Sequence, residues 1–167
     1  MNVCVYGSAH VPDEKCLQAA KALGGYIGKS GHTLVFGGFG DGLLGAVAEE
    51  AWKNGASVIS VLPKTPRKGH LEFSHSAQVF RDGDKRKRKK LQAEHADAFV
   101  VMPEGLGVLD ELFEVLLLKQ YGEHKKPIYI VNIEHKYDRL LSLLEEQNCK
   151  ELFSVISEHE FDKIDET

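Results

Sequence analysis

Residues 98–112 of the chain read AFVVMPEGLGVLDEL, which is an apolar run, a turn of proline and glycine, and the start of a helix-forming segment. An apolar run followed by a glycine-containing turn also occurs in VFGGFGDGLLG at residues 35–45 and in VCVYGSA at residues 3–9. Short, continuous apolar runs are typical of strands buried on both faces of a sheet. Strands that alternate with helices predict an α/β fold, in which helices cover both faces of a parallel sheet.

The rest of the chain continues this alternation, because apolar runs and apolar residues at helical spacing follow one another to the end. The expected strands span residues 3–6, 33–36, 57–62, 98–102 and 128–132, with short ones at 78–80 and after 153. The expected helices span about residues 17–30, 43–54, 84–95, 108–121 and 137–147. Residues 63–76 form a polar loop with two prolines, long enough to suggest a functional role. The pattern predicts a doubly wound, Rossmann-like sheet.

The composition bounds the class of protein. A chain of 167 residues that is 43% hydrophobic and 28% charged fits one globular domain over residues 1–167. Its formal net charge of -4 argues against a general nucleic-acid binder, and no apolar run is long enough to span a membrane. Three scattered cysteines and a beginning without signal-peptide features predict a reduced, cytoplasmic protein.

Three glycine-rich turns follow expected strands: Gly7-Ser8, Gly37 to Gly45, and Gly105 to Gly107. In open parallel sheets, ligands bind at the carboxyl ends of the strands. Glycines let the backbone approach a phosphate, and the N-terminus of a helix offers it free N–H donors. The alternative is that the glycines only relieve crowding in tight crossovers. Because the three turns fall on one edge, we expect a phosphate site there.

Charged residues flank these turns. Glu111 is expected in the first turn of a helix, close to the anion site; the alternative is that Asp110 and Glu111 only complement the helix dipole, at about 0.5 kcal/mol each. The basic run from Lys85 to Lys90 is usually a solvated helix face or, less often, a nucleic-acid patch. We expect Arg88 to point from this run to the same cleft.

Several motifs are absent from the sequence. There is no HExxH, CxxC, GxSxG or P-loop, and the eight histidines form no pair at metal-binding spacing. His10 follows the first turn and could face the cleft, but a histidine in this position is more often an exposed loop residue. The strand that ends at Leu62 has no acidic residue after it for a dinucleotide ribose, and no pyridoxal phosphate site is recognisable. We therefore expect no metal and no cofactor.

Taken together, the motifs resemble the Lonely Guy family of cytokinin riboside 5′-monophosphate phosphoribohydrolases, whose members were long labelled lysine decarboxylases. The resemblance covers nearly the whole chain. VCVYGSA matches the family's first strand and turn, and VFGGFGDGLLGAVAEEA at residues 35–51 matches its second-strand glycine motif. Residues 88–112, RKKLQAEHADAFVVMPEGLGVLDEL, align without a gap to its arginine helix and PGGxGTxxE motif.

The resemblance implies roles for individual residues. Arg88 and Glu111 fall on the catalytic arginine and glutamate, and the guanidinium is expected to hold the substrate and keep the glutamate ionised. The positions implied for binding the substrate and its phosphate are Gly7, Ser8, Gly37, Gly38, Gly42, Gly45, Lys89, Gly105, Gly107 and Val108. The implied reaction cleaves a nucleoside 5′-monophosphate into free base and ribose 5-phosphate. The implied assembly is a homodimer, or several dimers, joined through the apolar helix after Gly107.

Two residues depart from the PGGxGTxxE pattern. Glu104 stands where the family has glycine, which puts a carboxylate beside the phosphate site and would strain the turn if it needs a positive φ. Val108 replaces a threonine hydroxyl that is able to bond a phosphate. These departures keep open an alternative function, a catalytically weak module that binds a nucleotide or another phosphorylated ligand. A different enzyme on the same fold is the third hypothesis.

Overall fold

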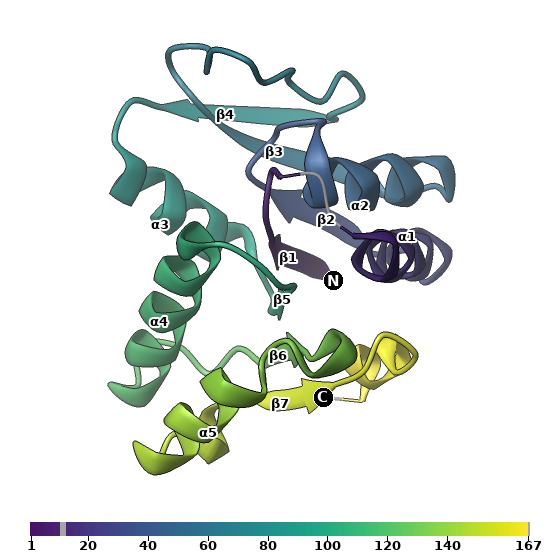
Figure 1. Ribbon diagram of the computed structural model, residues 1–167. Coiled ribbons are helices and arrows are strands. Elements are labelled where there is room, and N and C mark those ends of the chain that lie inside the picture. Colours follow the sequence, from purple (N-terminus) through teal and green to yellow (C-terminus); the bar gives the residue numbers. More distant parts are fainter. Residues whose placement is uncertain (11–12, 167) are drawn as a thin grey trace.

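A twisted sheet of seven parallel strands forms the centre of the molecule (Figure 1). The computed structural model describes residues 1–10 and 13–166. The strands are β1 (Asn2–Tyr6), β2 (Thr33–Phe36), β3 (Ser57–Pro63), β4 (Gln78–Asp82), β5 (Ala98–Val101), β6 (Ile128–Val131) and β7 (Ser154–Ile156). They lie side by side in the order β4-β3-β2-β1-β5-β6-β7.

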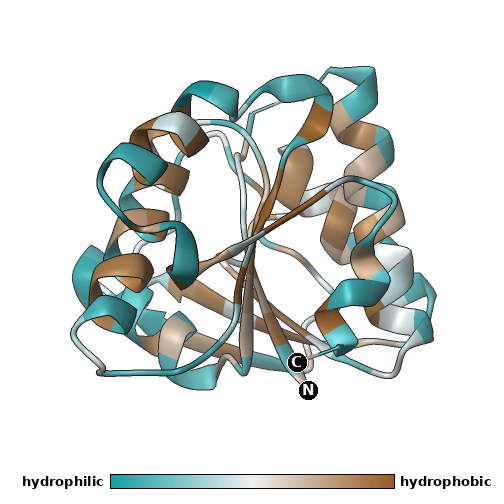
Figure 2. Ribbon diagram, turned by 90° about the horizontal axis from the view of Figure 1, so that it is seen from below, coloured by the Kyte–Doolittle hydropathy of each residue, from teal (hydrophilic) through white to brown (hydrophobic). Residues whose placement is uncertain are grey.

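Helices pack on both faces of this sheet. One face carries α1 (Glu14–Lys29) and α2 (Gly42–Lys53), and the other carries α3 (Lys85–His95), α4 (Leu106–Gln120) and α5 (Asp138–Glu146). Apolar strands cross the middle of the molecule and the polar helix faces point outward (Figure 2). Two buried clusters, one on each side of the sheet, form the core. The predicted α/β fold class is therefore confirmed.

The sequence placed the seven strands and the helices α1 to α5 within a few residues of their observed positions, with one consequential shift. Helix α4 begins at Leu106, earlier than expected, because Gly105 adopts φ 110° and acts as its N-cap. Glu111 therefore lies in the second turn of α4 and not in the first, as expected from the sequence. The short 3-10 helices Ile133–His135 and Lys150–Leu152 were not expected. In the part of the chain that the structure describes, we find no helix that is both long and apolar enough to span a membrane.

The strand order creates a switch point between β1 and β5. From β1 the chain adds β2, β3 and β4 on one side, and then returns to place β5 on the other side of β1. The connections leaving β1 and β5 therefore diverge, and the carboxyl ends of these two strands border the crevice where such sheets bind ligands. Gly7-Ser8 follows β1 and Pro103 to Gly105 follows β5, so two of the predicted turns meet at this point.

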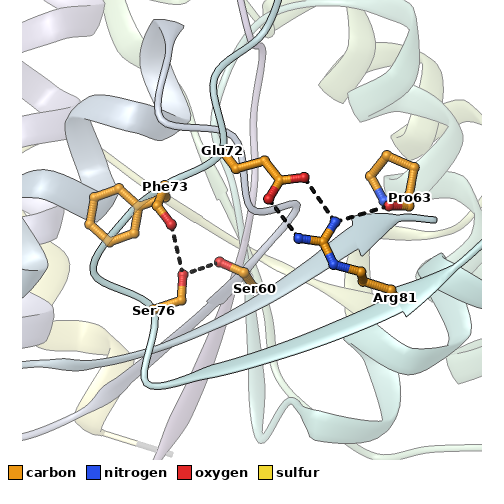
Figure 3. A network of polar contacts seen from close by, with 6 residues as sticks. All are labelled: Ser60, Pro63, Glu72, Phe73, Ser76 and Arg81. Atoms are coloured by element: carbon orange, nitrogen blue, oxygen red, sulfur yellow. Dashed lines mark hydrogen bonds and ion pairs between the residues drawn. The ribbon is translucent and has the colours of Figure 1, made fainter. Parts of the chain in front are cut away.

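The connection between β3 and β4, residues 64–77, is fixed to the sheet by polar contacts (Figure 3). The Arg81 guanidinium donates to both oxygens of Glu72, over 2.8 and 2.6 Å. The hydroxyls of Ser60 and Ser76 are 2.6 Å apart. These contacts attach the loop to both β3 and β4, so the loop can hold side chains in place at the edge of the sheet.

Adjacent glycines of α1 have opposite surroundings, and they supply a matched test of the packing between α1 and α2. A Cβ added to Gly24 would lie 2.4 Å from the carbonyl oxygen of Val47, whereas one added to Gly25 meets nothing closer than 3.9 Å. Gly24→Ala should lower the free energy of unfolding by about 2 kcal/mol through overpacking. Gly25→Ala should raise it by roughly 0.5–1 kcal/mol through helix propensity.

Urea unfolding of the two variants beside the wild type measures both changes. If Gly24→Ala and Gly25→Ala changed the free energy of unfolding by similar amounts, the close approach of α1 and α2 at Gly24 would not require a glycine there.

Candidate active site at the carboxyl ends of β1 and β5

The turns after β1 and β5 lie against each other. A Cβ added to Gly105 would be 3.8 Å from the Ser8 hydroxyl oxygen. The Met102 N–H donates to the Tyr6 carbonyl over 2.9 Å, which carries the pairing of the two strands up to the turns. The structure therefore brings Ser8 and Gly105 together, although they are far apart in the sequence. Gly7, directly before Ser8, packs against the side chains of Leu43 and Leu44 on α2.

Most of the glycines of the 37–45 motif, which connects β2 to α2 and includes the first residues of α2, are required by packing. A Cβ would lie 2.6 Å from Leu62 at Gly38, 2.3 Å from the Ala9 backbone at Gly42, and 2.2 Å from the Gly40 carbonyl oxygen at Gly45. These contacts fit the alternative reading of this motif, a tight crossover in which glycines relieve crowding. Gly37 differs, because the nearest atom to its added Cβ is the Gln92 amide nitrogen at 3.9 Å.

The turn between β5 and α4 is open by comparison. A Cβ at Gly107 would meet nothing within 4 Å, and the N-cap of α4, Gly105, has no side chain to cap the helix. The N-terminus of α4 can therefore present its first N–H groups to an anion. A groove of about 750 Å³ lies here, between α3 and α4. It is lined by Asp84, Lys85, Arg86, Lys89, Leu106, Gly107 and Asp110.

Two other expected binding residues already have partners within the protein. The Val108 side chain is buried in the core beneath α4, and its N–H donates to the Gly105 carbonyl over 3.1 Å. The Lys89 ammonium is 3.0 Å from the Asp110 carboxylate and also pairs with Glu114. Lys89 therefore joins α3 to α4.

Glu111 lies on α4 and is partly buried. Burial, with a contribution from Asp110, raises the pKa of its carboxyl to about 7, against the opposing effect of Lys89, Lys85 and Arg88. Among the described residues, no hydrogen bond or ion pair engages this carboxyl. The expectation that Arg88 keeps Glu111 ionised is therefore only partly met: nearby cations favour the charged form, but burial outweighs them. A carboxyl that titrates near neutral pH is suited to proton transfer.

Arg88 approaches the same edge of the sheet from α3. Its guanidinium donates through Nε and Nη2 to the Val61 carbonyl of β3, over 3.3 and 3.0 Å. Burial lowers its pKa, Glu111 raises it, and Arg67 of the 64–77 loop lowers it. Arg88 and Glu111 thus interact electrostatically, without forming an ion pair within 4 Å. The structure therefore places the two expected catalytic residues, Arg88 and Glu111, close enough to influence each other's pKa.

Glu104 has a counter-ion that sequence reasoning missed. The Lys136 ammonium is 2.7 Å from the Glu104 carboxylate and 2.8 Å from that of Asp13, the N-cap of α1. Glu104 has no positive φ, so the strain anticipated for a side chain at this position does not arise. Oxygens of both carboxylates and the Cys16 sulfur lie within 4.8 Å of one another, and Lys136 already bridges the carboxylates. No sequence pattern connects residues 104 and 136, because they are far apart in the chain and only the folded sheet brings them together.

The sequence is similar to those of known proteins over most of its length. A family model described as "possible lysine decarboxylase" matches residues 44–164. A cytokinin riboside 5′-monophosphate phosphoribohydrolase of Arabidopsis thaliana is 35% identical over 144 residues, which are 86% of this chain and 67% of that protein. A probable enzyme of the same name from Oryza sativa subsp. japonica is 33% identical over 158 residues, 94% of this chain and 63% of that protein. This chain thus spans about two thirds of these relatives.

Solved structures share the fold at lower sequence identity. The molybdenum cofactor carrier protein of Chlamydomonas reinhardtii has a TM-score of 0.72 and 22% identity, with 92% of this chain and 88% of that chain covered. A structural-genomics target solved by X-ray crystallography has a TM-score of 0.75 and 19% identity, with 99% and 98% covered. The family match and the curated relatives show that this chain belongs to the Lonely Guy family, whose model is the one described as a possible lysine decarboxylase.

Proposed function

We propose that this protein hydrolyses the N-glycosidic bond of a nucleoside 5′-monophosphate, AMP or a cytokinin riboside 5′-monophosphate, to free base and ribose 5-phosphate. The observation that carries the proposal is Glu111, a partly buried carboxyl without a direct partner among the described residues, whose raised pKa reflects burial and which interacts electrostatically with Arg88. The open turn at Gly105 and Gly107 supplies the phosphate site beside it. The activity for which the curated relatives are named supports the same reaction.

The chemistry follows from these positions. The 5′-phosphate binds the N-terminus of α4 and anchors the substrate away from the reacting bond. As the bond between C1′ and the base nitrogen breaks, its electron pair leaves with the base and C1′ gains oxocarbenium character. The Glu111 carboxylate stabilises this charge and orients the water whose oxygen bonds to C1′. The water's proton passes to the carboxylate and from there to the departing base nitrogen, so that the base leaves as a neutral molecule and Glu111 is ionised again. Arg88 holds the substrate in place.

We also propose that two copies of the chain associate through α4. Leu106, Phe113, Leu117 and Tyr121 are exposed and recur at a spacing that places them along one side of this helix. A contiguous apolar stripe on a surface helix marks a protein interface.

Replacing Glu111 by Gln should abolish base release and stabilise the fold at alkaline pH. A carboxyl whose folded-state pKa is raised from 4.5 to about 7 costs stability once it ionises, so the cost is absent below about pH 4.5 and complete above about pH 7. The melting temperature of Glu111→Gln should exceed that of the wild type at pH 8 and match it near pH 4. For the wild type, kcat/KM should rise as the pH passes through about 7, because the carboxylate is the active form.

Base release from AMP, followed by chromatography, and thermal melts across this pH range test both expectations. Unchanged turnover in Glu111→Gln would remove this residue from the mechanism. A wild type that binds AMP but never releases base would instead favour the binding module.

The Lys136 bridge predicts a charge effect on phosphate binding. Lys136→Met leaves the Glu104 and Asp13 carboxylates without their shared cation beside the phosphate site. The KM for AMP should therefore rise by roughly five- to tenfold, with kcat nearly unchanged, through electrostatic repulsion. The double variant Lys136→Met/Glu104→Gln should recover most of the loss.

The measurement is KM for AMP at low and high salt, since screening weakens repulsion between exposed charges. A loss that is independent of salt and persists in the double variant would mean that Lys136 acts only by holding the fold together.

The proposed dimer predicts a selective effect of charge on α4. Leu117→Lys should yield monomers, because it places an ammonium in an apolar interface. Leu143→Lys on α5 is the matched control, since Leu143 is 47% exposed and Leu117 is 52% exposed. Sedimentation velocity distinguishes the outcomes, and a wild type that sediments as a monomer would contradict the dimer.

A further inference from the structure

The single buried residue of α3 is a polar one, Gln92, whose exposure is 3%. Every other residue of this helix is at least partly exposed. A helix that packs on a sheet normally buries apolar side chains. The identity of this residue therefore calls for a reason other than packing.

The side-chain amide of Gln92 has no hydrogen-bond partner within residues 1–10 and 13–166. No side-chain nitrogen or oxygen that is completely shielded in this part of the chain lacks a partner. The Gln92 amide therefore keeps a small opening to solvent-accessible space. Because most buried polar side chains are hydrogen-bonded within the protein, an open and unpaired amide suggests a partner that arrives from outside.

The position of Gln92 shows which space the amide faces. Gln92 follows Arg88 by four residues, so the two side chains share one face of α3, one turn apart. Arg88 contacts the carboxyl end of β3, and the Gln92 amide nitrogen lies beside Gly37, directly after β2. Strand β2 neighbours β1, so the amide lies at the same sheet edge as the turns after β1 and β5.

A neutral amide suits a particular part of the substrate. It offers both a donor and an acceptor, which matches a hydroxyl or the edge of a base, whereas the phosphate is better met by cations and N–H groups. Adjacent strands are about 4.8 Å apart, so the ends of β5 and β2, on either side of β1, are separated by about 10 Å. A nucleotide whose phosphate lies at Gly105 would extend its sugar and base toward Gln92.

We propose that Gln92 is a substrate-binding residue whose side-chain amide hydrogen-bonds a neutral polar group of the nucleotide, a ribose hydroxyl or the edge of the base. This assignment rests on the proposed function. It makes Gln92 a determinant of specificity, because a buried amide left unpaired disfavours analogues that lack the matching group.

Gln92→Met tests the assignment, because methionine keeps the length of the side chain and removes its polar atoms. Loss of a substrate contact should lower kcat/KM for AMP by about tenfold while the melting temperature stays the same or rises. A purely structural amide gives the opposite pattern, a lower melting temperature with unchanged kcat/KM. An amide that only binds water leaves both values unchanged, and either result would overturn the proposal.

Substrate analogues identify the group that is bound. A smaller loss in Gln92→Met with 2′-deoxy-AMP than with AMP assigns the contact to the ribose hydroxyl, and a loss that changes between AMP and IMP assigns it to the base. Calorimetric affinity for AMP supplies a second readout that does not need turnover. A wild type without base release would contradict the proposed hydrolysis, yet weaker AMP binding by Gln92→Met would still support the contact.

Discussion

The parallel pairing of β1 with both β2 and β5 is the constraint on which the candidate site depends. It puts the carboxyl ends of three central strands on one edge, and the chain leaves β1 and β5 toward opposite sides of the sheet. The open turn at Gly105 lies directly before α4, which begins at Leu106 with this glycine, at positive φ, as its N-cap. Without this register, Ser8 and Gly105 would not meet.

The same edge concentrates groups that do not stabilise the fold. Glu111 is a carboxyl whose pKa is raised by burial, and Gln92 is a buried amide without a partner in the described chain. Stable cores avoid both kinds of group. Their presence on facing elements, α4 and α3, is what a binding site requires: polar groups desolvated in advance and paired only when a ligand arrives. By contrast, the carboxylate of Glu104 is already paired with Lys136.

The sequence was sufficient for features carried by local patterns. Apolar runs and glycine turns predicted the strands, the helices and the edge at which the turns gather, because each signal lies within a few consecutive residues. The start of α4 was placed too late, since the sequence does not reveal that Gly105 takes a cap conformation. The packing of Gly38 against Leu62, the pairing of Glu104 with Lys136, and the burial of Gln92 depend on contacts made only in the folded sheet. Patterns of consecutive residues do not reveal such contacts.

The most direct test of the central claim is to incubate the purified wild-type protein with AMP and separate the products by chromatography. Hydrolysis of the N-glycosidic bond predicts adenine and ribose 5-phosphate in equal amounts. Adenosine with inorganic phosphate would reveal a phosphatase. No product from AMP or from isopentenyladenosine monophosphate would contradict the assignment of this site to nucleotide hydrolysis.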